Sequence, residues 1–99
     1  MCGRFTSTAT PEELMLRFGV IITENLRPRW NVAPSQSATV IIRDGLHTEA
    51  ISAKWGLRHA GGNKSMLINA RMETANEKPT FSGAFLHSRC IVVASGWYE

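Results

Sequence analysis

The stretch TVIIRDGLHTEAISAKWGL, residues 39–57, indicates the fold class of this 99-residue chain. It opens with a β-branched run, contains the pair Asp44-Gly45, and continues into a second run in which apolar and polar residues alternate. An Asp-Gly pair between two such runs is a strong hairpin signal, because glycine readily adopts the backbone angles of a two-residue turn. We therefore predict a β-hairpin here.

The sequence on either side predicts short helices and further strands. Before the hairpin, TATPEELMLRFGV combines Thr10 as N-cap, Pro11 at the first helical position, Glu13 completing a capping box and Gly19 as a stop. After it, MLINAR reads as a short strand, TFSGAFLHS as a brief helix and RCIVVASGWYE as a buried strand with a polar end. The expected fold class is α+β and sheet-dominated.

Composition narrows the class of protein. The chain is 43% hydrophobic and 19% charged, which is typical of one small globular domain. Its net charge of +3 mildly favours an acidic partner such as nucleic acid. No apolar run approaches the roughly 20 residues that a membrane-spanning helix needs. We expect a cytoplasmic protein, associated with the nucleoid when bound to DNA.

The cysteines and histidines form no recognisable metal or disulfide pattern. Cys2 and Cys90 lie in unrelated contexts, and His47, His59 and His87 are scattered. A disulfide scaffold or a zinc site requires closer and more regular spacing. We therefore expect no metal and no cofactor, and the simplest interpretation of Cys90, inside an apolar run, is a buried thiol.

Cys2 in the opening MCGRF has a chemical option that an internal cysteine lacks. Removal of Met1 would leave an amine and a thiol on adjacent carbons, and such an aminothiol closes on an aldehyde to form a thiazolidine. In model peptides the two groups titrate at about 7.7–8.0 and about 8.5, so reactive forms of both exist near neutral pH. Two alternatives stay open: a small residue of no special role near the terminus, and an N-terminal nucleophile acting on a peptide bond.

Five separated motifs occur in order along the chain: MCGRF, RWNVAPSQ, KWGL, INARMET and SGWYE. In this combination the sequence resembles the SOS response-associated peptidase (SRAP) family, the abasic-site processing proteins. The resemblance implies a mostly antiparallel, barrel-like fold. It also implies that residues 1–99 form the N-terminal part of a single domain whose C-terminal half is absent.

The resemblance implies a function as well. Family members bind single-stranded DNA and recognise abasic sites, and their processed N-terminal cysteine forms a thiazolidine crosslink with the ring-opened sugar. The same cysteine is held responsible for autocatalytic removal of the initiator segment, so the implied enzyme is a cysteine autopeptidase with crosslinking and lyase-like activity. The expected partner is single-stranded DNA containing abasic sites, bound by a monomer.

Carried over motif by motif, the resemblance assigns three catalytic positions. Cys2 is the crosslinking nucleophile, Asn69 of INAR orients the deoxyribose, and Glu99 of SGWYE assists ring opening and proton transfer. General acid–base help of this kind is typically worth ~10²–10⁴ in rate. The family's catalytic histidine belongs to the half that this chain lacks.

Five further positions are candidate DNA contacts. Arg4 and Arg71 are expected to clamp phosphates, since a guanidinium grips two oxygens at once, and Lys78 adds a point charge. Asn31 and Pro34 of NVAP are expected to shape the loop around the site, although simple turn chemistry explains them as well.

Trp55 and Trp97 could stack on bases, but core packing is the favoured interpretation of both. RHAGGNKS, residues 58–65, departs from the family pattern, which leaves part of the DNA-facing loop open. Two other functions compete with crosslinking. One is an inactive or noncovalent single-stranded DNA-binding half-domain, and the other is a cysteine peptidase that acts on other proteins.

Overall fold

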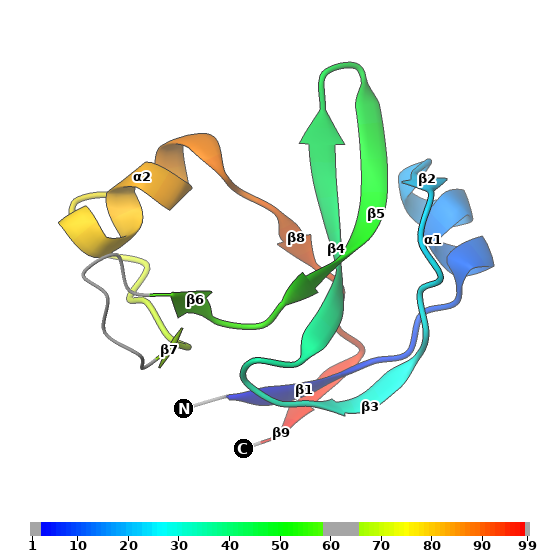
Figure 1. The fold of residues 1–99 in the computed structure, drawn as a ribbon, viewed down its shortest axis with the longest axis horizontal. Helices are drawn as coiled ribbons and strands as arrows, with labels where there is room; N and C mark the ends of the chain where they lie inside the picture. The colour runs from blue at the N-terminus through cyan, green and yellow to red at the C-terminus, as the bar shows by residue number, and fades with distance from the viewer. Residues whose placement is uncertain (1–2, 59–65, 99) are drawn as a thin grey trace.

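The computed structural model describes residues 3–58 and 66–98. Within these ranges, short strands dominate and two helices lie on opposite sides of the long central hairpin (Figure 1). The elements are β1 (Arg4–Ser7), α1 (Pro11–Phe18), β2 (Ile21–Ile22), β3 (Arg29–Val32), β4 (Ser37–Asp44), β5 (His47–Lys54), β6 (Leu57–Arg58), β7 (Met66–Leu67), α2 (Pro79–His87), β8 (Ile91–Val92) and β9 (Gly96–Tyr98).

The predicted hairpin is confirmed as β4–β5. Its antiparallel register runs without interruption from Ser37 opposite Lys54 to Asp44 opposite His47. Asp44 is thus the last paired residue, and the turn lies at Gly45 and Leu46, one position later than expected. Gly45 has φ 61°, and glycine at the first turn position accepts this angle without a steric penalty.

Three sheets organise the strands. β8 and β2 flank the hairpin in the order β2-β5-β4-β8, β1 lies between β3 and β9, and β6 pairs with β7. All pairings are antiparallel except that of β2 with β5. The prediction of a sheet-dominated, mostly antiparallel α+β fold is confirmed. In the part of the chain that the structure describes, the three sheets are separate and form no closed barrel.

Both helices begin and end close to where the sequence places them. The Thr10 hydroxyl accepts a hydrogen bond of 3.2 Å from the backbone N–H of Glu13, and Gly19 ends α1 in the left-handed conformation at φ 62°. The brief helix expected in TFSGAFLHS is α2. With 8 and 9 residues, neither helix of the described ranges has the length and apolar character needed to cross a membrane.

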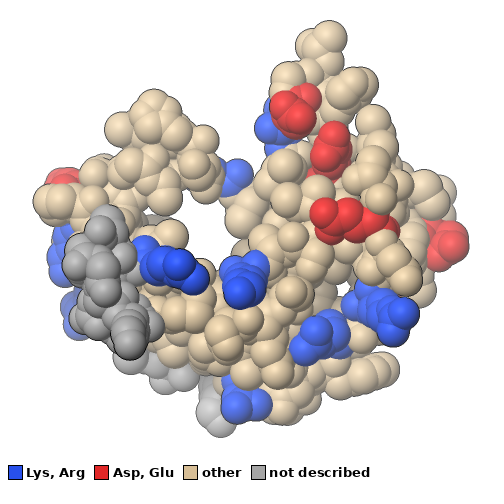
Figure 2. Space-filling view, in the orientation of Figure 1, with Lys and Arg blue, Asp and Glu red and all other residues tan. Residues whose placement is uncertain are grey.

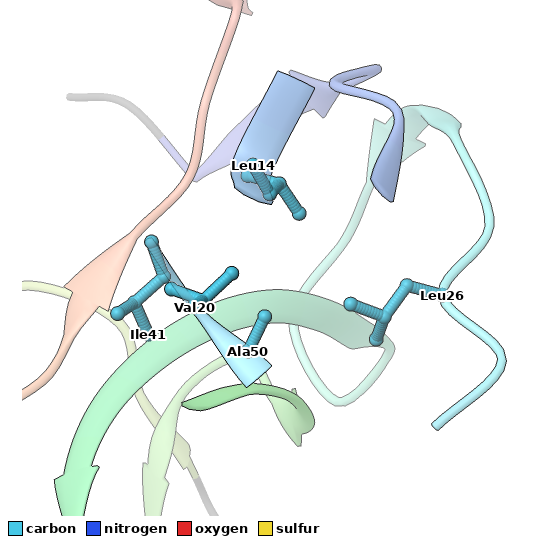
Figure 3. Close-up of a cluster of buried hydrophobic side chains, with 5 residues drawn as sticks. All are labelled: Leu14, Val20, Leu26, Ile41 and Ala50. Atoms are coloured by element: carbon cyan, nitrogen blue, oxygen red, sulfur yellow. The ribbon is translucent and has the colours of Figure 1, made fainter. Parts of the chain in front are cut away.

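Two small apolar clusters hold the fold together. One lies under α1, where Leu14 is 1% exposed and faces the hairpin (Figure 3); its members are Leu14, Val20, Leu26, Ile41 and Ala50. The other joins β1 to β3 and β4 through Phe5, Val32 and Ala38, with Trp55 packed against it. This second cluster supports the strand that follows Cys2 in the sequence.

The single buried strand expected over RCIVVASGWYE is wrong. The chain forms β8 at the edge of the hairpin sheet, leaves it, and forms β9 beside β1. The crossing is anchored by the Ser7 hydroxyl, which donates to the Val93 carbonyl at 2.7 Å, and by Ser95 N–H, which donates to the Thr6 carbonyl at 2.8 Å. The apolar residues of β8 stay accessible, with Ile91 54% and Val92 38% exposed.

Candidate functional site

The sheet β3-β1-β9 brings three of the five sequence motifs side by side. β1 contains Arg4 and Phe5 of MCGRF, β3 contains the RWNV of RWNVAPSQ, and β9 contains the GWY of SGWYE. Phe5 lies opposite Val32 on one neighbour and opposite Trp97 on the other, and Arg4 lies opposite Tyr98. β1, the strand that follows Cys2 in the sequence, thus pairs with residues 27 positions away on β3 and 94 positions away on β9.

One face of this sheet presents Arg4 together with two polar neighbours. The Arg4 guanidinium donates through Nη1 to Oδ1 of Asn31 at 3.3 Å, and both side chains are exposed. Directly opposed residues of an antiparallel pair point to the same side, so Tyr98 shares this face with Arg4. The Tyr98 hydroxyl donates to the Trp30 carbonyl at 2.7 Å, which ties β9 to β3 across β1. The structure therefore brings together Arg4 and Asn31, two of the predicted site residues, and places Tyr98 beside them, a residue that the sequence reasoning missed.

Pro34 lies in a tight turn directly after β3. Ser35 has φ 73°, and the Gln36 side chain stabilises the turn by accepting hydrogen bonds from Ala33 N–H at 3.0 Å and from the Arg29 guanidinium at 3.1 Å. Asn31 and Val32 of NVAP belong to β3, and the turn follows directly after them. It leaves Pro34 half-buried beside the candidate site.

Trp55 is a packing residue, as favoured, whereas Trp97 is not. The Trp55 ring meets Phe5 edge to face at a centroid separation of 5.1 Å, and its indole N–H donates to the Gly3 carbonyl at 3.0 Å. Trp97 is 67% exposed, so its interpretation as a core residue is wrong. Trp30 is 71% exposed as well. Both rings lie outside the packed cluster that Trp55 joins, which buries Val32 on the same strand as Trp30.

Asn69 lies at an apolar pocket of about 290 Å³ between the hairpin, β6–β7 and α2. Asn69 is exposed, and Trp55 and Val92 are among the other lining residues. The residue before it, Ile68, is so close to the start of β1 that a Cβ built on Gly3 would lie 3.3 Å from the Ile68 side chain. The INAR segment and the MCGRF segment are therefore neighbours in space.

Two details of this region differ from expectation. The strand predicted over MLINAR covers only Met66–Leu67, so Asn69 and Arg71 follow β7 instead of lying within it. Cys90, predicted to be buried, is exposed and lines the same pocket as Asn69. An apolar run is buried only where both faces of the strand are covered, and the described elements leave β8 accessible.

Arg71 and Lys78 lie on the segment between β7 and α2. Both side chains are exposed, and the Arg71 carbonyl accepts hydrogen bonds from Thr74 and Ala75 at the first turn of this segment. Neither residue belongs to the sheet that carries Arg4 and Asn31. Two further predicted residues, Cys2 and Glu99, lie outside the described residues. The described residues nearest to them, Gly3 and Tyr98, lie at neighbouring strand ends.

Charge is unevenly distributed over the molecule. In Figure 2, most Lys and Arg side chains visible on this face lie in its lower half, over β1, β3 and the β6–β7 region, whereas Asp and Glu gather toward the hairpin and α1. Within residues 3–58 and 66–98, no three His, Cys, Asp or Glu side chains form a group that could hold a metal ion. The basic half is the side on which an anionic ligand would be attracted.

The structure is thus a sheet-rich α+β fold, and the residues of its candidate site lie around the start of β1. A sequence model of the SOS response associated peptidase (SRAP) family matches residues 1–99, and the chain belongs to this family.

Several curated proteins are similar to this chain. Abasic site processing proteins YoqW and YoaM of Bacillus subtilis (strain 168) are each 35% identical over 106 aligned positions, covering 100% of this chain and 47% of the relative. Abasic site processing protein YedK of Escherichia coli (strain K12) is 32% identical, with the same coverage. The chain thus spans about half the length of the curated relatives it matches.

A solved structure agrees with this assignment. The crystal structure of a protein from Bordetella bronchiseptica matches with a TM-score of 0.74 at 25% identity, covering 99% of this chain and 50% of that one. The arrangement of helices and sheets described above is therefore shared with one half of a larger solved chain.

Proposed function

We propose that this protein captures abasic sites in single-stranded DNA by forming a thiazolidine crosslink through Cys2. The observation that carries the proposal is membership of the SRAP family, together with matches over the whole of this chain to about half of proteins named for abasic site processing. The convergence of MCGRF, RWNVAPSQ and SGWYE on one sheet supports it, because the chemistry needs these segments in one place.

The proposed reaction balances without a cofactor. Hydrolysis of the Met1–Cys2 peptide bond frees the α-amine, and this step is the autopeptidase activity that we propose for Cys2. The amine then condenses with the aldehyde of the ring-opened sugar, forming an imine and releasing one water. Addition of the thiol to the imine carbon, with its proton moving to nitrogen, closes the thiazolidine ring.

The neighbouring residues have positioning and proton-transfer roles in this proposal. Asn69 holds sugar oxygens, because an amide is both donor and acceptor and does not compete as a nucleophile. Glu99 acts as the acid and base that opens the closed hemiacetal of the sugar. Both roles require the sugar to lie where the INAR segment meets the start of β1, and the contact between Ile68 and Gly3 brings these segments together.

The DNA strand is held mainly by its phosphates. Arg4, already oriented by Asn31 at 3.3 Å, grips the phosphate next to the lesion, and Arg71 and Lys78 hold the backbone further along. Pro34 lies near the bases of the bound DNA strand. Phosphate contacts position a strand without reading its sequence, which suits recognition of a lesion.

A second candidate is noncovalent binding of single-stranded DNA. It is favoured by one observation, namely that the chain spans 47% of its curated relatives, so groups from the other half are not among its residues. In that case binding would be salt-sensitive and would leave no covalent product.

The two candidates are separated by a crosslinking experiment. A uracil-containing single strand is treated with uracil-DNA glycosylase, incubated with the protein and analysed on a denaturing gel after heating. Crosslinking predicts a heat-stable adduct that disappears in Cys2→Ser and persists in Cys90→Ser. The second variant is a matched control, because Cys90 is the other cysteine and is exposed. An adduct that survives Cys2→Ser contradicts the proposal, and binding without any adduct supports the noncovalent candidate.

A further inference from the structure

Trp55 makes contacts with three of the segments that carry predicted site residues. Its indole N–H is hydrogen-bonded to the residue before β1, and its backbone is hydrogen-bonded to the turn that contains Pro34. Trp55 also lines the pocket that Asn69 lines. The indole N–H donates to the carbonyl of Gly3, the residue adjacent to Cys2. We infer that Trp55 is the positioning residue that sets the backbone next to Cys2 for the crosslinking reaction; this inference rests on the proposed function.

The first contact fixes the peptide unit that joins Gly3 to Arg4. The indole Nε1–H donates to the Gly3 carbonyl at 3.0 Å, a normal length for a hydrogen bond of this type. The Trp55 ring also packs edge to face on Phe5, which is 5% exposed, with an interplanar angle of 81°. The strand is thus held at Gly3 by a directional bond and at Phe5 by packing.

The second set of contacts fixes Trp55 itself. Ser35 N–H donates to the Trp55 carbonyl, and Trp55 N–H donates to the Gln36 carbonyl, both at 2.8 Å. The backbone of Trp55 is therefore locked to the turn after Pro34. A rotation of that turn would be transmitted to Gly3 through the indole ring.

The third relationship links this arrangement to Asn69. Trp55 and Asn69 line the same pocket, and Ile68, adjacent to Asn69, lies against Gly3. Gly3 is therefore held between Trp55 and Ile68. Small displacements of a reacting group cost much of the rate of a positioned reaction, so loss of one of these supports should slow capture more than it weakens binding of the strand.

The test removes the N–H group that donates from Trp55 to the Gly3 carbonyl and keeps a fused bicyclic ring of similar shape. Trp55 is replaced by β-(3-benzothienyl)alanine, in which sulfur takes the place of the indole N–H, and the same replacement at Trp30, which is 71% exposed, is the matched control. Three quantities are measured: the rate of adduct formation at saturating abasic single strand, the affinity for an undamaged single strand, and amide hydrogen exchange at Arg4 and Phe5.

We expect the replacement at Trp55 to slow adduct formation about 3- to 10-fold, as loss of one hydrogen bond predicts. Affinity for the undamaged strand should stay within about twofold, and exchange at Arg4 and Phe5 should accelerate. The replacement at Trp30 should change neither the rate nor the exchange.

An unchanged rate in the Trp55 variant would overturn the inference while leaving the proposed function intact. If the wild-type protein forms no adduct, the proposed function fails instead, and exchange alone decides the inference. Faster exchange at Arg4 and Phe5 would then uphold positioning of the strand by Trp55, and unchanged exchange would overturn it.

Discussion

The Arg4 guanidinium lies 3.3 Å from the side-chain oxygen of Asn31 on the neighbouring strand, although the two residues are 27 positions apart in the sequence. An amide oxygen orients a guanidinium by accepting one of its hydrogens. The pair places the Arg4 guanidinium on the face shared with Tyr98, and this geometry leads to the first prediction.

Arg4→Ala should weaken binding of single-stranded DNA about tenfold, because a hydrogen bond to a charged group is worth about 1.5–3 kcal/mol. Loss of one phosphate contact should also reduce the slope of log affinity against log salt by about 0.7. Fluorescence anisotropy at several salt concentrations measures both quantities. Arg43→Ala is the control, since Arg43 lies at the hairpin end, near the Gly45 carbonyl. Equal losses in both variants would show that only net charge matters.

Asn69→Asp should slow adduct formation about 2- to 10-fold, because the change keeps the size of the side chain but removes its donor hydrogens. The added negative charge also opposes the approach of a phosphate-bearing strand. Rates of gel-detected crosslinking check the prediction. The matched change Asn76→Asp, at an exposed turn residue, should leave the rate near that of the wild type. Wild-type rates in the Asn69 variant would remove this residue from the site.

Trp97→Ala should weaken binding of single-stranded DNA by about 1–3 kcal/mol if the exposed ring stacks on a base. The thermal midpoint should change little, because 67% of the side chain is already accessible to solvent. Leu46→Ala at the hairpin tip, where the side chain is 94% exposed, is the control for loss of an exposed apolar group. Anisotropy and thermal unfolding together test the prediction, which a normal affinity in the Trp97 variant would contradict.

Leu14→Ala should reduce the free energy of unfolding by about 2–5 kcal/mol, since the side chain is 1% exposed at the centre of the cluster under α1. Leu16→Ala removes the same atoms from the same helix, but Leu16 is 89% exposed, so its change should stay within about 0.5 kcal/mol. Urea unfolding followed by circular dichroism gives both values. Similar losses would mean that α1 does not pack on the hairpin as described.

Gly45→Ala and Gly83→Ala should change stability in opposite directions. A Cβ built on either glycine meets no atom within 4 Å, so neither alanine would clash with a neighbouring residue. Gly45 has φ 61°, where an alanine costs about 1–2 kcal/mol, whereas Gly83 lies within α2, where alanine gains about 0.5–1 kcal/mol. Urea unfolding of both variants measures the contrast. A destabilised Gly83 variant would argue against the helix.

Local features were predicted well from the sequence, and long-range ones were not. The N-cap at Thr10 and the stop at Gly19 depend on neighbouring residues, and both are confirmed. The exposure of Trp97 and Cys90 was predicted wrongly. Periodicity reports which face of a strand is apolar, but only the tertiary pairing decides whether a neighbour covers that face. For the same reason the donation from Trp55 to Gly3 has no sequence signal.

By itself, the sequence determined that this chain is α+β, where its hairpin and helices lie, and, through five ordered motifs, the family to which it belongs. Only the tertiary structure decided that Arg4 meets Asn31, that Tyr98 joins them, and that Trp55 holds Gly3. Turns and caps arise from interactions within a few residues. A site assembled from strands more than 25 positions apart exists only once those strands have paired.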